Sequence, residues 1–403
     1  MPADTPQKSL PESHAPPSNP IAALTFTAFA GTMALLAFVA VAGPISELLM
    51  LSTWQLGLVM SISGIAWMVS ARFWGVISDR VGRRRIILTG IAGFALSYAA
   101  LTTFLAIAVP ARFALVIALA GLILGRGAMG AFYSSVPTLA AAIVADLAKP
   151  ERRAAKMAGI GAASSLGMVV GPGAAGLLGR YDLILPLAAT LVLPIIAFAL
   201  LYIALPKDRP AEGTRRAPLG LMDRRLRLAL VMAVLASMAV AVAQTLIGFL
   251  LIDRMGMAPA DAASGAGTAL AIVGVSLFAT QLVVRKLARP PRSLLALGSL
   301  VAAIGFAGVA LSMATWQVWG GYALIACGMG CIYPAVPALA TNSVSAQEHG
   351  GAAGAVTTAQ GLGIVIGPLF GGFLYEIAPG LAFATVAAAF LSAAIVLARA
   401  PRE

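Results

Sequence analysis

Long apolar stretches recur along the chain and are separated by short polar connections. A helix of about 20 apolar residues, rising 1.5 Å per residue, crosses a hydrocarbon core of about 30 Å. The pattern therefore predicts an all-α polytopic membrane protein with twelve transmembrane helices. The predicted spans are 22–44, 55–77, 86–108, 113–143, 157–179, 183–205, 228–252, 263–284, 294–314, 317–342, 351–375 and 379–399.

The two longest polar stretches divide the chain into four parts. Residues 1–20 are rich in Pro and Ser and are expected to form a disordered cytoplasmic tail. We expect an N-terminal six-helix bundle over 21–205, a cytoplasmic linker over 206–227 and a C-terminal six-helix bundle over 228–400. No separate soluble domain fits between the predicted spans.

Composition supports the bilayer as the solvent of this chain. Apolar residues make up 60% of the sequence against 10% charged residues, and the mean hydropathy is +0.94. Water-soluble domains have a far larger charged fraction. The two cysteines, Cys327 and Cys331, lie four residues apart in an apolar span, where small packing residues are more common than metal or redox sites.

The positive charges lie on alternate connections. A net charge of +12 in a soluble protein would suggest nucleic acid as a partner, but here only Arg112, Arg180 and Arg254 fall on one side of the predicted spans. Because cytoplasmic loops carry the excess of Lys and Arg, this asymmetry predicts cytoplasmic termini and an even number of spans. The Ala- and Arg-rich composition favours a bacterial inner membrane.

The sequence contains an internal repeat. Residues 129–140 match 329–340, with shared Met-Gly, Tyr and Val-Pro positions, and 167–176 match 363–372 at nearly the same distance. Six helices separate the copies, so both have the same orientation in the membrane. This predicts two parallel six-helix bundles related by a pseudo-twofold axis along the membrane normal, with a cavity between them near the midplane.

The connection between the second and third spans carries a compact motif. Its residues are Gly75, Asp79, Arg80, Gly82, Arg83 and Arg84. Glycine allows close helix approach and a tight turn, and the arginines suit an anionic headgroup layer. The motif resembles the cytoplasmic signature loop of the major facilitator superfamily.

That resemblance implies that Asp79 forms a clasp at the cytoplasmic side which favours the outward-facing state. Asp79 could accept hydrogen bonds from the neighbouring arginines and face the N-terminus of a helix that starts at that side. The alternative is an anchoring turn without a switching role. The second half has Arg285 in the place of Asp79, so a clasp would be one-sided.

Arg126 lies near the middle of the fourth predicted span in a glycine-rich stretch that resembles the helix 4 motif of the same family. A central arginine costs at least about 2.5 to 3.5 kcal/mol on insertion scales, so such a residue normally faces a bundle interior or a wet cavity. It could bind an anionic solute group or perturb an acid, and snorkelling to the interface is the alternative. Glu47, Asp146 and Glu376 all lie near span ends and offer no mid-membrane acid.

A second motif lies in the fifth predicted span and recurs in the eleventh. The two sets are Gly167, Gly171, Pro172 and Gly176, and Gly363, Gly367, Pro368 and Gly372. Proline kinks the helix, and glycines at this spacing let a neighbouring helix approach closely. The pattern resembles that of the family's exporters, the antiporters, which implies export, although ordinary small-residue packing would also use these residues.

Other residues within apolar spans are candidates for the cavity wall. They are Met129, Tyr133, Ser164, Gln244, Tyr333 and Gln360. Each could instead form a hydrogen bond between helices or a packing contact. With so few polar groups, we expect a mostly apolar cavity for an amphipathic or lipophilic solute.

Together these patterns predict a secondary active transporter that exports a small solute by alternating access, coupled to an ion, expected to be a proton. A dedicated siderophore or metabolite exporter and an uptake symporter of the same fold are the alternatives. The two histidines, His14 and His349, form no catalytic or metal constellation, so an enzyme is not expected. We expect no cofactor, no metal and no nucleic acid, and a monomer whose partners are the solute, the coupling ion and the lipid bilayer.

Overall fold

The computed structural model describes residues 19–148, 150–206, 223–287, 289–345 and 348–399, and these are helical with short connections. Twelve helices are long and apolar enough to cross a membrane, which confirms the predicted fold class. Residues 1–18 of the predicted tail and residues 207–222 of the predicted linker lie outside the described residues.

The helices are α1 (Pro20–Leu48), α2 (Thr53–Val81), α3 (Arg83–Ala111), α4 (Leu115–Tyr133), α5 (Ser135–Leu147), α6 (Pro150–Leu178), α7 (Leu185–Thr190), α8 (Val192–Ala204), the 3-10 helix η1 (Arg224–Leu226), α9 (Arg227–Asp253), α10 (Pro259–Leu287), α11 (Pro291–Ala310), α12 (Thr315–Asn342), α13 (His349–Ile377) and α14 (Leu381–Arg399).

Two predicted spans are interrupted in the structure. The fourth span consists of α4 and α5, which meet at Ser134, and the sixth consists of α7 and α8, which meet at Leu191. Pro137 and Pro194 each follow the last residue of the earlier helix by four positions. Because proline has no amide proton to donate, the regular hydrogen bond at each junction is missing and the helix breaks there.

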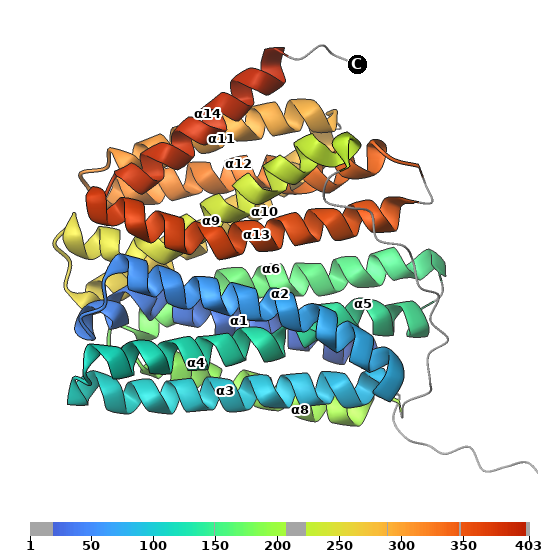
Figure 1. Cartoon of the computed structure of the whole chain (residues 1–403), viewed down its shortest axis with the longest axis horizontal. Coiled ribbons are helices and arrows are strands. Elements are labelled where there is room, and N and C mark those ends of the chain that lie inside the picture. Colours follow the sequence, from blue (N-terminus) through green and yellow to red (C-terminus); the bar gives the residue numbers. More distant parts are fainter. Residues whose placement is uncertain (1–18, 149, 207–222, 288, 346–347, 400–403) are drawn as a thin grey trace, which may run out of the picture.

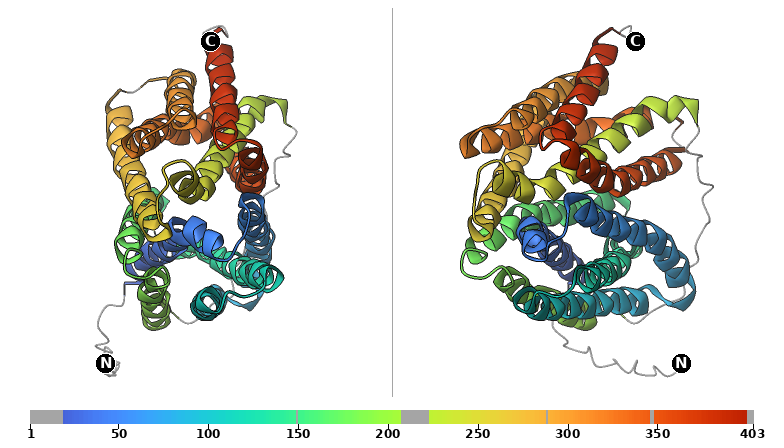
Figure 2. Two further views of the ribbon diagram at one scale, coloured as in Figure 1. Left: turned by 90° about the vertical axis from the view of Figure 1, so that its left-hand side faces the viewer. Right: turned by 60° about the vertical axis from the view of Figure 1, so that its left-hand side comes forward.

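The helices form two bundles. Figure 1 shows α1 to α8 in the lower half of the molecule and α9 to α14 in the upper half; most long helices run along the horizontal axis of the view, while α9 and α14 are tilted. The end view in Figure 2 separates the halves, coloured blue to green and yellow to red. Large exposed apolar side chains such as Leu124, Ile203 and Val396 cover the flanks, where lipid tails would contact them.

The internal repeat has the same packing in both bundles. A methyl group added to Gly171 of α6 would lie 2.6 Å from the Met33 carbonyl oxygen of α1, and one added to Gly367 of α13 would lie 2.6 Å from the Met238 carbonyl oxygen of α9. The glycines therefore let α6 approach α1 as closely as α13 approaches α9. This agreement supports the pseudo-twofold relation that the repeat predicts.

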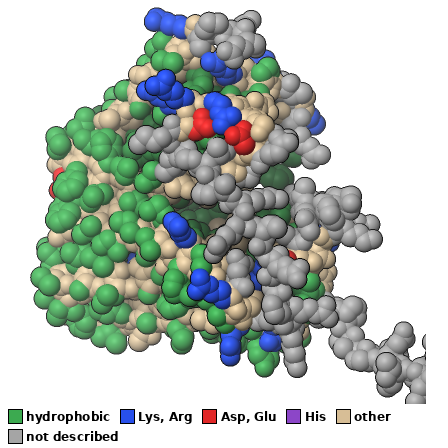
Figure 3. All heavy atoms as spheres, turned by 45° about the vertical axis from the view of Figure 1, so that its right-hand side comes forward, with side chains coloured by type: hydrophobic (Ala, Val, Ile, Leu, Met, Phe, Trp, Pro, Cys, Tyr) green, Lys and Arg blue, Asp and Glu red, His purple; other side chains and the backbone are tan. Residues whose placement is uncertain are grey.

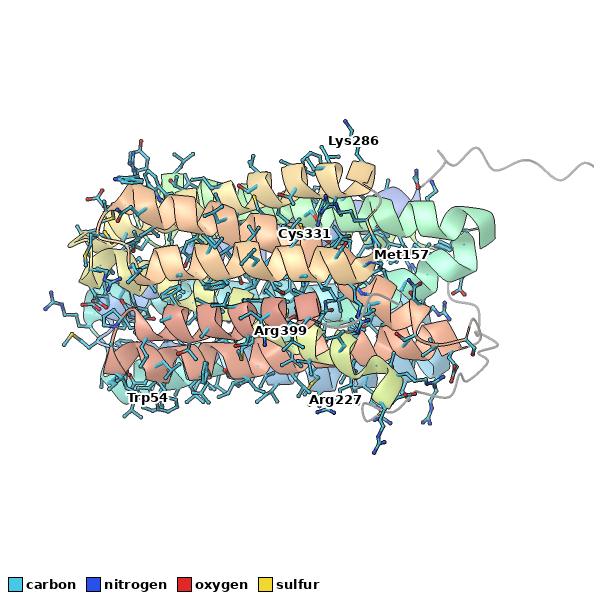
Figure 4. All side chains as sticks on the ribbon, turned by 90° about the horizontal axis from the view of Figure 1, so that it is seen from above. Trp54, Met157, Arg227, Lys286, Cys331 and Arg399 are labelled. Carbon is cyan, nitrogen blue, oxygen red and sulfur yellow. The ribbon has the colours of Figure 1, made fainter. Side chains whose placement is uncertain are left out.

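The two ends of the molecule differ. We call the end at which α1 begins and α14 finishes the terminal end, and the opposite one the far end. Figure 4 shows Trp54 at the far end, while Arg227 and Lys286 lie toward the terminal end. In Figure 3, Lys and Arg side chains gather over the terminal end and apolar side chains cover the adjoining flank. This distribution matches the charge asymmetry of the sequence.

Candidate functional site

A central cavity of about 580 Å³ lies between the two bundles. Helices α2 and α4 of one bundle and α9 and α13 of the other supply most of its wall, and α1 completes it. Its lining includes Leu36 and Val39 of α1, Met60, Trp67 and Met68 of α2, Arg126 of α4, Gln244 and Thr245 of α9, and Thr358, Gln360 and Gly361 of α13. A cavity of this size that is mostly apolar with a few polar groups is typical of a small-molecule site.

A second cavity of about 730 Å³ lies on the other side of α1 and α9. Its wall comes mainly from α6 and α10 and includes Pro172 and Phe278. Leu36 and Gln244 line both cavities. The two cavities are therefore neighbours that meet at α1 and α9.

Arg126 is buried in the wall of the central cavity, with 7% of its surface exposed. Its Nη2 atom lies 3.6 Å from the Met60 sulfur, and its guanidinium lies 4.6 Å from the centre of the Phe38 ring. Its Nε and Nη1 atoms are buried and have no hydrogen-bond partner within the described part of the chain. Among the described residues no carboxylate forms an ion pair with this guanidinium.

Close packing of α4 against α2 fixes the position of Arg126. Ser63 donates a hydrogen bond of 2.9 Å to the Arg126 carbonyl oxygen. A methyl group added to Gly130, one turn further along, would lie 2.4 Å from the Ser63 carbonyl oxygen. The glycine-rich stretch identified in the sequence therefore holds α4 against α2 and presents the arginine to the cavity.

The predicted cavity residues separate into two groups. Gln244 and Gln360 line the central cavity. Met129 and Tyr133 are buried in the bundle interior instead, and the Tyr133 hydroxyl lies 3.3 Å from Thr32. Tyr333 and Ser164 are partly buried and are not among the residues that line either cavity. Met60 and Trp67 of α2 also line the central cavity, although neither was predicted to do so.

The signature loop is tied to its own bundle. Arg83 donates to Asp146 and to the Ala142 carbonyl oxygen of α5. Arg84 donates a 2.8 Å bond to the Tyr202 carbonyl oxygen of α8 and lies over the Tyr202 ring at 5.1 Å.

Two glycines and Arg80 complete the described part of the loop. Gly82 has a φ of 110°, which explains why a glycine stands between α2 and α3. A methyl group added to Gly75 would lie 3.6 Å from the Thr138 methyl group, and Arg80 is exposed. The side chains of Asp79 and Arg285 lie outside the described residues, so the clasp stays a prediction.

Glycines and prolines of the second motif also lie where the bundles meet at the far end. A methyl group added to Gly267 of α10 would lie 2.4 Å from the Pro172 carbonyl oxygen, and one added to Gly57 of α2 would lie 2.3 Å from the Pro368 carbonyl oxygen. Gly176 likewise packs directly on Gly267. These contacts are equivalent under the pseudo-twofold relation and involve backbone atoms on both sides.

Two glycines of α1 and α9 also pack directly against each other. A methyl group added to Gly43 would lie 2.7 Å from the Gly248 Cα, and one added to Gly248 would lie 2.9 Å from the Gly43 Cα. We call this pair together with the Gly57–Pro368 and Gly176–Gly267 contacts the far-end seal. These contacts hold the two bundles together at the far end.

Polar groups and an aromatic pair reinforce the far-end seal. Thr53 of α2 donates hydrogen bonds of 3.0 Å to the Gly372 carbonyl oxygen and 3.3 Å to Glu376 of α13. The Trp54 amide donates to the same carboxylate at 3.4 Å. The rings of Trp54 and Phe373 stack with centroids 5.7 Å apart. The Glu376 carboxylate thus lies at the N-terminus of α2, where negative charge is favourable.

At the terminal end a small ionic cluster joins the start of α9 to the start of α13. Arg225 bonds to Asp223 at 2.8 Å and to Glu348 at 2.9 Å. Hydrogen bonds from Arg225 and Ser345 lower the pKa of Glu348 to about 2, and those from Arg225 also lower the pKa of Asp223. Asp223 and Arg225 lie just before α9 and Glu348 lies just before α13, and both helices belong to the C-terminal bundle, so this cluster does not bridge the bundles.

Comparison with known proteins agrees with this architecture. The family model of the Major Facilitator Superfamily matches residues 21–368 and 290–403. The tetracycline resistance protein of class G from Vibrio anguillarum is 28% identical over 348 residues, which cover 80% of this chain and 81% of that protein.

Two solved transporters share the fold. One is a bacterial homologue of the human lysosomal transporter Spinster in an inward-facing, unoccupied conformation, with a TM-score of 0.71, 16% identity and coverage of 96% of both chains. The other is the nucleoside transporter NupG, with a TM-score of 0.73, 12% identity and coverage of 94% of this chain and 98% of that one. The chain therefore belongs to the Major Facilitator Superfamily, and it is a multi-pass membrane transporter and not an enzyme.

Proposed function

We propose that this transporter exports a small amphipathic or lipophilic solute from the cytoplasm by alternating access. The observation that carries the proposal is the mostly apolar cavity between the bundles, which the far-end seal closes on one side. Similarity to the tetracycline resistance protein over four fifths of the chain supports export, as does the resemblance of the Pro172 motif to that of exporters.

The packing of glycines supports an opening toward the terminal end. A methyl group added to Gly159 or Gly161 of α6, or to Gly354 of α13, would meet no atom within 4 Å. Glycines at the far end of the same two helices are in tight backbone contact across the bundles. With both termini in the cytoplasm of a bacterial cell, this arrangement is the inward-facing state, in which an exporter takes up its solute.

Among the described residues no carboxylate lines either cavity. A coupling proton would therefore bind at a residue outside the cavity wall. We propose that the transporter works as a monomer and uses the proton gradient, with Asp79 as the clasp that holds the terminal end closed in the opposite state. The shared fold does not by itself set the direction of transport, which the following assay measures.

Accumulation of a panel of fluorescent anionic, neutral and cationic dyes in cells with and without the protein tests the proposal. Expressing cells should accumulate less of at least one dye, and an uncoupler of the proton gradient should abolish the difference. Higher accumulation in expressing cells would show uptake and refute export.

A matched pair of variants shows whether the central cavity carries the solute. Gly361 lines this cavity, and a methyl group added to it would lie 3.7 Å from the Met68 sulfur, so Gly361→Leu should fill the cavity and abolish the difference in accumulation. Gly320→Leu introduces the same side chain where no atom lies within 4 Å, and it should leave transport unchanged at equal expression.

A further inference from the structure

We infer that the solute of the central cavity is an amphipathic organic anion whose acidic group binds Arg126. This inference rests on the proposed function for the cavity but not on the direction of transport. It names the charge of the solute, which the apolar character of the wall leaves open.

Charge in the cavity is of one sign. Arg72 and Arg126 both line the central cavity, and among the described residues no Asp or Glu lines it or its neighbour. Arg126 is 7% exposed and therefore belongs to the wall, while Arg72 is exposed. A solute in this cavity thus meets a fixed positive charge without a negative counterpart.

The contacts of Arg126 leave much of its bonding capacity unused. Its neighbours are the ring of Phe38 and the sulfur of Met60, and the buried Nε and Nη1 atoms have no hydrogen-bond partner among the described residues. A guanidinium has five N–H donors and no acceptor, so it can bond an oxyanion but not an ammonium group. Buried charges are otherwise paired in proteins because an unpaired one is costly.

A bound anion would remove this cost. Hydrogen bonds between arginine and a carboxylate or similar oxyanion are charge-assisted and about twice as strong as neutral ones. The apolar wall raises the strength of the attraction further, since the local dielectric constant is low. The same charge repels a cation, so the site discriminates between solutes of one shape and different charge.

The rest of the wall fits the body of such a solute. Met60, Trp67 and Met68 of α2 offer an apolar and aromatic surface beside Arg126. Gln244 and Gln360 of the other bundle provide neutral hydrogen-bonding groups. A solute held by Arg126 on one bundle and by these amides on the other would contact both halves at once.

Binding to the purified full-length protein tests the inference with three probes that share one aromatic body. The probes are naphthylacetate, naphthylethanol and naphthylethylamine, which are anionic, neutral and cationic at neutral pH. We expect naphthylacetate to bind about tenfold or more tightly than naphthylethanol, as charge-assisted bonds of this kind imply. The amine should bind more weakly than the alcohol.

Variants of Arg126 show whether this residue sets the preference. Arg126→Gln should lower naphthylacetate affinity by about tenfold and leave naphthylethanol within about twofold, while Arg126→Lys should keep part of the preference. Arg180→Gln removes an exposed charge that is remote from the cavity and should change neither affinity. Retained alcohol binding by Arg126→Gln shows that this variant is folded.

The inference is overturned if naphthylacetate does not bind best of the three probes, if the preference is unchanged in Arg126→Gln, or if none of the probes binds. Failure of the export proposal is distinguishable from these. If naphthylacetate binds through Arg126 but enters cells through the protein, export is wrong and the anion preference stands. If the amine binds best and is exported, export stands and the anion preference is wrong.

Discussion

Replacement of Gly43 by alanine should shift the transporter away from the conformation in which the far-end seal is closed. The added methyl group would lie 2.7 Å from the Gly248 Cα, whereas ordinary contact begins at 3.4 Å, so the backbones of α1 and α9 must part by about 0.7 Å. No flexible side chain can move aside, because the obstructing atoms belong to backbone. Overpacking of this kind costs about 1 to 3 kcal/mol.

This cost applies only while the far-end seal is closed. A change of about 1 to 3 kcal/mol alters the ratio of two conformations by about 5- to 150-fold. Gly43→Ala should therefore raise the share of molecules that are open at the far end by that factor. Gly248→Ala should have the same direction of effect, since the two glycines contact each other.

The separation between spin labels at Met50 and Ile377 measures this shift. Both residues are exposed, at 82% and 74%, and they lie at the far end on different bundles. The labels require a background in which Cys327 and Cys331 are replaced by alanine. Gly43→Ala should move the distance distribution toward longer values.

A matched control separates seal opening from the general effect of alanine in a helix. Gly308 of α11 has no atom within 4 Å of an added methyl group, so Gly308→Ala changes helix propensity without a collision. It should leave the distribution as in the wild type. An unchanged distribution in Gly43→Ala would refute the reasoning that the glycine contact limits far-end opening.

Three other perturbations address polar groups. Glu376→Gln removes the charge that lies beside the Thr53 hydroxyl and the start of α2. It should raise the share of molecules open at the far end by about two- to fivefold in the same distance measurement. A shift toward shorter distances would contradict this. Because the folded-state pKa of Glu348 is lowered to about 2, the contribution of its contact with Arg225 is present above the ordinary carboxyl pKa and is lost only as the pH falls toward about 2. The difference in melting temperature between the wild type and Glu348→Gln should therefore stay constant between about pH 8 and 5, and a difference that disappears in this range would show that the contact is not formed. Asp79→Asn should reduce transport by about tenfold or more with unchanged membrane insertion, and equal transport at equal expression would rule out the clasp.

Hydrophobic pattern and repetition predicted most of the architecture. Twelve stretches of the right length gave twelve spans, because the thickness of the bilayer limits helix length so strictly. The breaks at Ser134 and Leu191 were not predicted, although Pro137 and Pro194 were visible in the sequence. Proline within a span does not by itself tell whether the helix bends or breaks, since α12 continues through two prolines.

The cavity wall was harder to predict than the helices. Arg126, Gln244 and Gln360 are recognisable in the sequence as polar groups in apolar spans, and they line the central cavity. Tyr133 has the same character in sequence, but its hydroxyl bonds within the bundle. Met60 and Trp67 had no distinguishing signal, because an apolar side chain can face lipid, bundle interior or cavity with equal ease.

The glycine contacts separate two properties that a transporter must combine. At the far-end seal the pathway is closed largely by main chain, and main-chain atoms are the same in every protein. At the cavity the wall consists largely of side chains, whose shape and polarity change with each substitution. Substitutions around Arg126 can therefore change which solute binds without weakening the far-end seal. The same closing mechanism can then serve transporters of different solutes.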